Sequence, residues 1–227
     1  MSLKGTWEEF IGPFFSWDNN FWRTCIDLFK NPKDVLEAYI SGARKKYFQP
    51  FSFLILYATI AVLFYKFFPY DIGEFQEGFN KGYQSTGGKN PAFDVKAFYE
   101  NMFNYYNFIV IATVPFYALI TYITFIKKGN NYSEHLVFNC YLHTIIGYFS
   151  MLLQLVFLNI FHLPNTMFYI QILFSIVYSI YVFKKLYALN TKQILISTLY
   201  FWLLAIAFFI FFSLIAGIFI FIKIALK

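Results

Sequence analysis

Five long apolar runs, separated by short polar segments, dominate the pattern of positions along the chain. Each run contains at least 17 residues, and the only charged side chain within them is Lys66, near the end of the first. A helix of about 20 apolar residues, rising about 1.5 Å per residue, crosses the roughly 30 Å hydrocarbon core of a bilayer. The sequence therefore predicts an all-α integral membrane helical bundle of about five transmembrane helices. The predicted spans are Phe48–Phe68, Phe108–Ile126, Leu136–Phe161, Met167–Phe183 and Ile194–Ile222.

Residues 1–47 precede the first span and have a different pattern. They interleave charged with aromatic residues, including three of the four tryptophans, and contain no run that could span a bilayer. We expect amphipathic helices in the membrane interface, one up to residue 29 and another over Pro32–Ser41. An anchor packed beneath the bundle is the favoured interpretation, and a docking site for a soluble partner is the alternative. The first helix would place on one face Phe21, Trp22, Cys25, Ile26 and Phe29.

The chain therefore divides into a cytoplasmic segment, 1–47, and a five-span bundle, 48–227, with an outer loop over 70–106. That loop contains five acidic residues and three lysines, a balance that suits the outer face of the membrane better than the inner face. Residues 84–88 have the composition of a flexible turn. Asn90-Pro91 supplies the capping residue and the proline with which helices often begin. We expect that helix to continue to Tyr106 and either to lie on the membrane or to cover the mouth of the bundle.

Basic residues predict the orientation of the bundle. With the N-terminus inside, twelve Lys and Arg lie on the inner side and six on the outer side. An excess of Lys and Arg in cytoplasmic segments is the usual arrangement, so we expect a cytoplasmic N-terminus and an outer C-terminus. Arg44, Lys45 and Lys46 crowd together just before the first span. With Tyr47 beside them, they are the candidates for binding lipid phosphates or an acidic partner.

Composition narrows the classes of function. Hydrophobic residues make up 59% and charged residues 13% of the 227 residues, outside the usual range for a soluble domain. The net charge of +6 does not indicate nucleic acid, because the cations lie in short segments beside spans, where orientation and anionic headgroups account for them. Cys25 is expected on the inner side and Cys140 inside a span, so a disulfide is not expected.

The candidate for site chemistry lies at the start of the third span. After residue 100 the chain has one carboxylate, Glu134, and His135, Asn139 and His143 follow at four-residue intervals on one helix face. Ionisable groups at membrane depth are costly and point to function. We favour a structural lock, in which Glu134 pairs with the cations at 44–46 and His143 stays neutral. A metal or proton site is less favoured, because two histidines two helical turns apart cannot share one ion without help; no metal or cofactor is expected.

Three kinds of function fit the sequence. The first is a non-catalytic scaffold or accessory subunit that binds a membrane partner or lipids, because no catalytic motif is present and the N-terminal segment offers an aromatic, charged platform. The second is a transporter-like protein for small solutes or lipids. A membrane enzyme or metal site at Glu134, His135 and His143 ranks third, so an enzyme is not expected. The residues that could line a transport path are Pro115, Gln154, Asn159, Gln171 and Ser175.

Two motifs carry a resemblance to a known family. The first comprises Thr24-Cys25-Ile26-Asp27-Leu28, Pro32, Val35, Tyr39, Ile40, Gly42, Arg44, Lys46, Tyr47 and Pro50, and the second comprises Tyr132, Glu134, His135, Val137, Phe138 and His143. Together they resemble an uncharacterised family of bacterial multi-pass membrane proteins, domain of unknown function 3667. The resemblance implies a bacterial inner-membrane protein and no particular activity. Members of that family often begin with a cysteine ribbon that should bind zinc, and this sequence lacks those cysteines.

Overall fold

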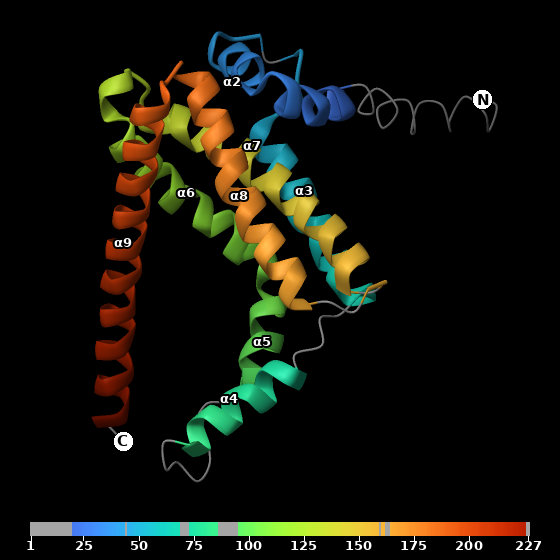
Figure 1. The fold of residues 1–227 in the computed structure, drawn as a ribbon, viewed down its shortest axis with the longest axis vertical. Helices are drawn as coiled ribbons and strands as arrows, with labels where there is room; N and C mark the ends of the chain where they lie inside the picture. Colours follow the sequence, from blue (N-terminus) through green and yellow to red (C-terminus); the bar gives the residue numbers. More distant parts are fainter. Residues whose placement is uncertain are drawn as a thin grey trace, which may run out of the picture. The chain divides into compact units, whose positions relative to one another are not determined.

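The computed structural model describes residues 20–43, 45–68, 73–85, 95–158, 160–161 and 164–225. Within these ranges every regular element is a helix (Figure 1). A first helix covers residues 20–30 and is called helix 20–30 below. The others are α2 (Pro32–Ile40), α3 (Pro50–Phe67), α4 (Gly73–Ser85), α5 (Val95–Asn104), α6 (Tyr106–Thr124), the 3-10 helix η1 (Ile126–Lys128), α7 (Tyr132–Leu153), the π-helix η2 (Gln154–Leu158), α8 (Pro164–Leu186) and α9 (Thr191–Ala225).

Five helices of the described chain are long and apolar enough to cross a membrane: α3, α6, α7 with η2, α8 and α9. Their ends agree with the predicted spans to within four residues. The agreement has a simple cause, because each apolar run is bounded by charged or turn-forming residues that mark where the membrane core ends. The predicted all-α membrane bundle is therefore confirmed.

The five spans differ in how much of their surface the protein itself covers. In α7 with η2, 67% of the most apolar 18-residue stretch is buried, whereas in α9 only 6% of such a stretch is buried. The described part of α9 exposes large apolar side chains along most of its length, among them Leu199, Leu203 and Phe209. An apolar helix that the rest of the chain leaves uncovered suits contact with lipid.

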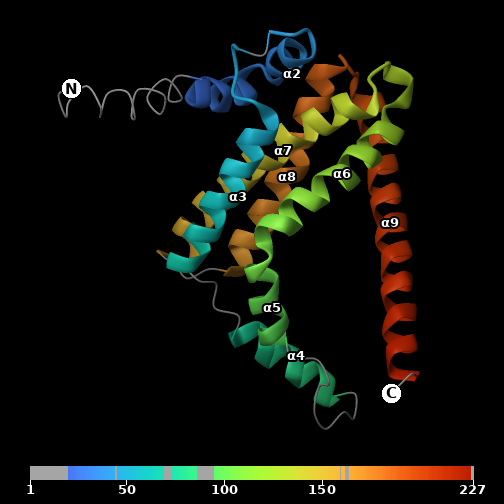
Figure 2. The same ribbon diagram turned by 180° about the vertical axis from the view of Figure 1, so that it is seen from behind.

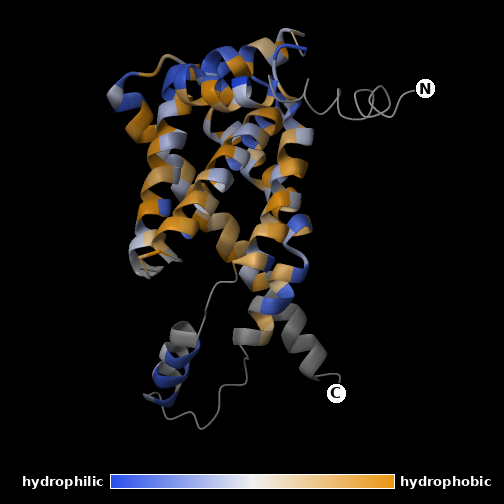
Figure 3. Cartoon of the chain, turned by 90° about the vertical axis from the view of Figure 1, so that its right-hand side faces the viewer, coloured by the Kyte–Doolittle hydropathy of each residue, from blue (hydrophilic) through white to orange (hydrophobic). Residues whose placement is uncertain are grey.

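The chain forms two compact units, and the boundaries between them fall inside α6, α7 and α8. Unit 1 comprises Met1–Phe48, Pro115–Asn139 and Ile176–Lys227, and unit 2 comprises Gln49–Val114 and Cys140–Ser175. Unit 1 thus holds helix 20–30, α2 and α9, together with parts of α6, α7 and α8 (Figure 2). Within unit 1, hydrophilic residues gather at the end that holds helix 20–30 and α2 (Figure 3).

In unit 2 an aromatic cluster joins α3 to α7. The ring of Phe53 lies 6.1 Å from that of Tyr141, and the ring of Tyr57 lies 5.3 Å from that of Tyr148. The Tyr57 hydroxyl lies 2.8 Å from that of Tyr106 on α6. Gly147 makes this packing possible, because a Cβ at that position would occupy the space of the Tyr57 ring.

The segment between the first two spans is more helical than expected. Residues 73–85, predicted as part of a loop that ends in a turn at 84–88, form α4, and the helix predicted to begin at Asn90-Pro91 appears as α5. Asn90-Pro91 itself lies outside the described residues. Phe75, Phe79 and Tyr83 recur at four-residue intervals, a helical period that the three glycines and the polar composition of the segment obscured.

Candidate functional site

Helix 20–30 is tied to the segment that leads into the first span. The Thr24 side chain is fully buried, and its hydroxyl donates to the carbonyl of Asn20 at 2.6 Å. The same oxygen accepts a hydrogen bond from the backbone N–H of Phe48 at 2.8 Å. A buried N–H without a partner is costly, so Thr24 supplies the acceptor that this turn of the chain requires.

Tyr47 also holds this segment against helix 20–30. Its hydroxyl donates to Asp27 at 3.1 Å, and only 3% of the residue is exposed. Burial raises the pKa of Tyr47, so the phenol keeps the proton that it donates. The ammonium group of Lys46 lies 5.0 Å from the centre of the Tyr47 ring, within the range of a cation–π contact. Tyr47 therefore belongs to the internal packing of unit 1, and Arg44 lies outside the described residues.

Two tyrosines of α8 hold the C-terminal end of helix 20–30. The Tyr178 hydroxyl donates to the carbonyl of Leu28 at 3.2 Å. The Tyr181 hydroxyl lies 3.0 Å from the carbonyl oxygen of Phe29 and 2.9 Å from that of Lys30. The last four carbonyls of a helix lack hydrogen-bond partners within the helix, and the two tyrosine hydroxyls are the donors for these carbonyls. Helix 20–30 is thus fixed to the C-terminal part of α8 as well as to Tyr47 and Phe48.

A concentration of cations surrounds this junction, and we call it the basic end of unit 1. The end of α8 adjoins the turn after α6, because the Phe125 ring stacks 4.8 Å from the Phe183 ring. Of the ten described basic residues at the basic end, only Lys33 has an ion-pair partner within the described part of the chain, Glu37 at 3.6 Å. The ten residues are Arg23, Lys30, Lys33, Lys45, Lys46, Lys127, Lys128, Lys184, Lys185 and Lys192.

Two residues of the predicted polar stripe on α7, His135 and Asn139, lie in a buried hydrogen-bond network. His135 is fully buried, and its Nδ1 lies 3.1 Å from the hydroxyl of Thr121 on α6. Asn139 donates to the same hydroxyl oxygen at 2.8 Å and to the carbonyl of His135 at 2.8 Å. The Tyr187 hydroxyl, just after α8, lies 3.3 Å from Nε2 of His135. The network therefore joins α6, α7 and the end of α8 inside unit 1.

The hydroxyl of Thr121 also lies 3.1 Å from the carbonyl oxygen of Ala118, to which it can donate. When Thr121 donates to Ala118, a neutral His135 with its proton on Nδ1 donates to Thr121 and accepts at Nε2 from Tyr187. Burial and the nearby Glu134 carboxylate raise the pKa of Tyr187, so its proton is available for this bond. Every polar group named here has a partner, which is the arrangement that stabilises a buried network.

Glu134 caps the N-terminus of α7. Its carboxylate accepts from the backbone N–H of Asn131 at 2.9 Å, and the Asn131 side chain accepts from the backbone N–H of Glu134 at 2.9 Å. This reciprocal pair is a capping box. Asn190 and Gln193 form the same arrangement at the start of α9, with distances of 2.8 and 3.1 Å.

The predicted lock between Glu134 and the cations at 44–46 has no ion pair among the described residues. Their two ion pairs are Lys33–Glu37 and Lys81–Glu77, so neither Lys45 nor Lys46 pairs with Glu134. Pairing with Arg44 stays a prediction, because Arg44 lies outside the described ranges. In the structure the Glu134 side chain caps the N-terminus of α7.

His143 is the last residue of the predicted polar stripe. It lies two turns further along α7 and falls in unit 2, whereas His135 and Asn139 fall in unit 1. Among the residues that the structure describes, no group of three or more His, Cys, Asp and Glu side chains could hold a metal ion.

Two of the side chains considered for a transport path, Gln154 and Ser175, have local partners. Gln154, in η2, is 2% exposed and donates to the carbonyl of Phe68 at 2.9 Å, at the C-terminal end of α3. Ser175 is exposed and donates to the carbonyl of Ile172 in its own helix at 2.8 Å. Asn159 lies outside the described residues. These contacts are those of helix packing, in which polar side chains satisfy backbone groups.

Sequence reasoning missed four of the residues that make the site: Thr121, Tyr178, Tyr181 and Tyr187. Each is a hydroxyl in or beside an apolar run, and nothing in its spacing distinguishes it from the other tyrosines and threonines of the spans. Only the identity of the neighbouring helix reveals its role. One signal was available, since Asn-x-x-Glu at 131–134 and Asn-x-x-Gln at 190–193 both match the capping-box pattern.

Comparison with known proteins bears on the N-terminal part of this site. No curated protein and no solved structure matches the chain. The model of one protein family matches residues 18–62, which include Thr24, Asp27 and Tyr47. The matched residues therefore hold the hydrogen bonds that tie helix 20–30 to Tyr47 and Phe48, and the motif at 132–143 lies beyond them. The match confirms the resemblance found in the sequence: over residues 18–62 this multi-pass membrane protein is similar to the family described as Protein of unknown function (DUF3667).

Proposed function

We propose that this protein is a non-catalytic scaffold or accessory subunit of the bacterial inner membrane. Its basic end would engage anionic groups, either phosphates of membrane lipids or acidic residues of a membrane partner. The observation that carries the proposal is the number of exposed cations at the basic end that have no ion-pair partner among the described residues. Juxtamembrane Lys and Arg near an anionic surface each contribute about 1 kcal/mol of attraction.

The state of the other polar groups supports a binding role over catalysis. The candidates for site chemistry are His135, Asn139 and Glu134. Their side chains form hydrogen bonds with neighbouring helices and with a helix end. A general acid or base must reach a substrate proton, and these groups instead stabilise unit 1. Lys45 and Lys46, by contrast, are exposed.

Native mass spectrometry of the full chain, purified from its host membrane in mild detergent, tests the proposal. We expect the wild type to retain anionic lipid or a partner protein. A Lys45→Gln/Lys46→Gln variant should lose several-fold of that material, because two of the exposed cations are removed. Lys66→Gln/Lys81→Gln removes the same charge from unit 2 and should leave retention unchanged.

Two results would contradict the proposal. One is a wild-type protein that is reproducibly monomeric and carries neither lipid nor partner. The other is equal loss of bound material in both double variants, which would mean that net charge matters and the basic end does not.

A further inference from the structure

Helix 20–30 carries apolar side chains in two different surroundings. On one side Leu28 is buried, 2% exposed, against the rest of unit 1. On the other side Trp22, Ile26 and Phe29 are 59%, 48% and 46% exposed. The sequence predicted a single apolar face containing Cys25 as well as these three residues, whereas Cys25 is only partly exposed. Trp22 and Ile26 therefore form the exposed part of a narrow apolar stripe that ends at Phe29, whose ring also lies 5.4 Å from the ring of Tyr178.

The stripe has the form of a membrane-facing surface. At about 100° of rotation per residue, its three side chains fall within about 60° of helix circumference. Arg23 and Lys30, both exposed, lie about 80–100° from Trp22 along one edge of the stripe. A helix with Trp and other large apolar residues on one face and cations beside them is the type that lies in the bilayer interface.

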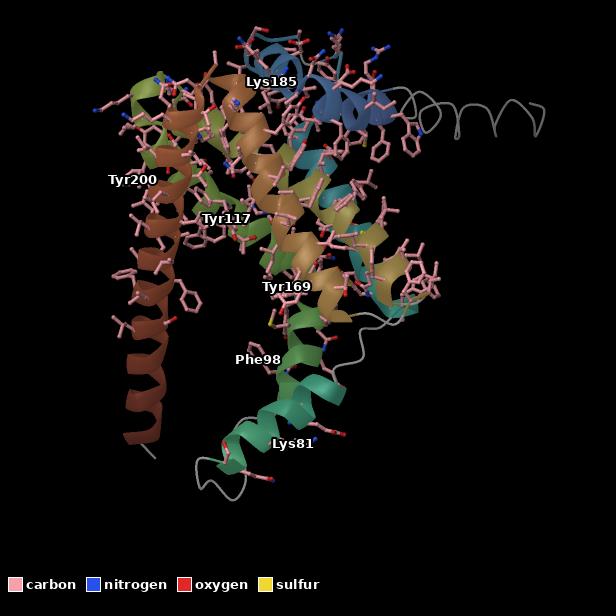
Figure 4. The ribbon with its side chains drawn as sticks, viewed as in Figure 1. Lys81, Phe98, Tyr117, Tyr169, Lys185 and Tyr200 are labelled. Atoms are coloured by element: carbon pink, nitrogen blue, oxygen red, sulfur yellow. The ribbon has the colours of Figure 1, made fainter. Side chains whose placement is uncertain are left out.

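The contacts with α8 place this helix at a definite depth. Tyr178 and Tyr181, which bind its last carbonyls, precede Lys184 by six and three residues in the same helix. At about 1.5 Å per residue, the backbones of Tyr181 and Tyr178 lie about 5–9 Å from Lys184 toward the apolar part of α8, and the end of helix 20–30 lies within reach of their side chains from that level. Lys184 and Lys185 mark the headgroup level, because the apolar run of α8 ends there. Lys185 is labelled near this end of α8 in Figure 4. Interfacial helices bury their apolar face about 5–10 Å into the boundary between headgroups and acyl chains.

We infer that helix 20–30 is an interfacial helix whose stripe of Trp22, Ile26 and Phe29 inserts into the bilayer beside the fourth span, with Arg23 and Lys30 among the lipid phosphates. The occupant of the stripe is therefore lipid. Insertion of the stripe goes beyond the proposed function. It does not require the basic end to bind a partner, because it concerns apolar side chains of a helix that α8 holds in place.

Spin labels at single cysteines test the insertion in the full chain. The background is Cys25→Ser/Cys140→Ala, and the protein is reconstituted in vesicles of phosphatidylcholine and phosphatidylglycerol. Collisions of the nitroxide with oxygen, which concentrates in the bilayer, are compared with collisions with a nickel chelate, which stays in water. Labels at Ser85→Cys and Leu203→Cys, on exposed residues of α4 and α9, provide the references for water and for bilayer.

A label at Ile26→Cys should give an oxygen-to-nickel collision ratio between the two references and several-fold above that of Arg23→Cys. Trp22→Cys provides a second position on the stripe and should behave as Ile26→Cys does. A ratio at both stripe positions equal to that at Ser85→Cys would overturn the inference, because the stripe would then lie in water. Shielding of both positions from both reagents would also overturn it, because protein would then cover the stripe.

Discussion

Individual polar side chains in this protein act mainly by satisfying backbone groups or one another. Thr24 accepts from Phe48, Gln154 donates to Phe68, and Tyr178 donates to Leu28. Each of these bonds joins segments that are far apart in the sequence. In an apolar bundle a backbone group at a helix end has no water to bind, so one hydroxyl or amide decides where two segments meet.

The network around His135 predicts a large effect of a small change at Thr121. Thr121→Val keeps the shape of the side chain but removes the acceptor for two buried donors, His135 and Asn139. We expect the free energy of unfolding to fall by about 1–2 kcal/mol. The midpoint of thermal unfolding in detergent, at a fixed scan rate, measures it.

Thr124→Val is the matched control for that measurement. It makes the same chemical change one turn further along α6, where the hydroxyl binds only the carbonyl of Ile120 at 2.7 Å. That variant should change the midpoint little. Equal shifts for Thr121→Val and Thr124→Val would show that the network adds nothing beyond an ordinary hydroxyl.

Gly147 supplies a second prediction at this scale. Gly147→Ala places a methyl group in the space of the Tyr57 ring, so α3 and α7 must separate or the ring must move. We expect a loss of stability of about 1–3 kcal/mol, measured by the same unfolding midpoint. Gly82→Ala in α4, where an added Cβ meets nothing within 4 Å, should be neutral or slightly stabilising. A Gly147→Ala variant as stable as wild type would contradict the packing described for unit 2.

At the scale of elements, two spans begin with the same device. α7 begins with Asn131 and Glu134, and α9 begins with Asn190 and Gln193. Glu and Gln serve equally well in this position, because either side chain offers an oxygen to the backbone N–H of the capping residue. The function of Glu134 as a cap can therefore be separated from any function of its charge.

Two substitutions at Glu134 make that separation measurable. Glu134→Ala removes the cap and should lower the stability by about 1 kcal/mol, whereas Glu134→Gln keeps the cap and should lower it by a few tenths of a kcal/mol. Gln193→Ala and Gln193→Glu repeat the comparison on α9. Thermal unfolding of the four variants provides the readout. If Glu134→Gln proves as damaging as Glu134→Ala, the charge itself matters and the lock with Arg44 is supported.

The positions of the spans could be predicted from the sequence, and their partners could not. An apolar run of about 20 residues has one stable solution in a bilayer, so the ends of α3, α6, α8 and α9 followed directly. Hydrogen bonds such as that from Tyr178 to Leu28 depend on which helices become neighbours, and the pattern of apolar residues does not indicate which helices these are. The helix α4 was missed because its glycines and polar residues lower the apolar signal that marks a span.

At the scale of the whole molecule, the arrangement of spans predicts which segments face the same side of the membrane. One span, α6, separates Ser85 from Lys128. Single cysteines at these positions should therefore react with an impermeant maleimide from opposite sides. By the distribution of Lys and Arg, Ser85→Cys should react from outside and Lys128→Cys from the cytoplasm.

The same labelling in intact cells and in inverted vesicles gives the control. Cys25→Ser/Cys140→Ala removes the two native thiols, so each signal belongs to one position. Reaction of both cysteines from the same side would mean that α6 does not cross the membrane. Reaction of Ser85→Cys only from the cytoplasm would reverse the predicted orientation.

The attachment of helix 20–30 to α8 also has a consequence for biosynthesis. The carbonyl of Leu28 and the hydroxyl of Tyr178 that binds it are separated by 150 residues. At about 5–20 residues per second, a ribosome needs about 8–30 s to make that stretch. Trp22 and Ile26 leave the ribosome during that time, before the helix that will hold them in place exists. The N-terminal segment is therefore the part of the nascent chain that most needs early contact with the membrane or with a chaperone.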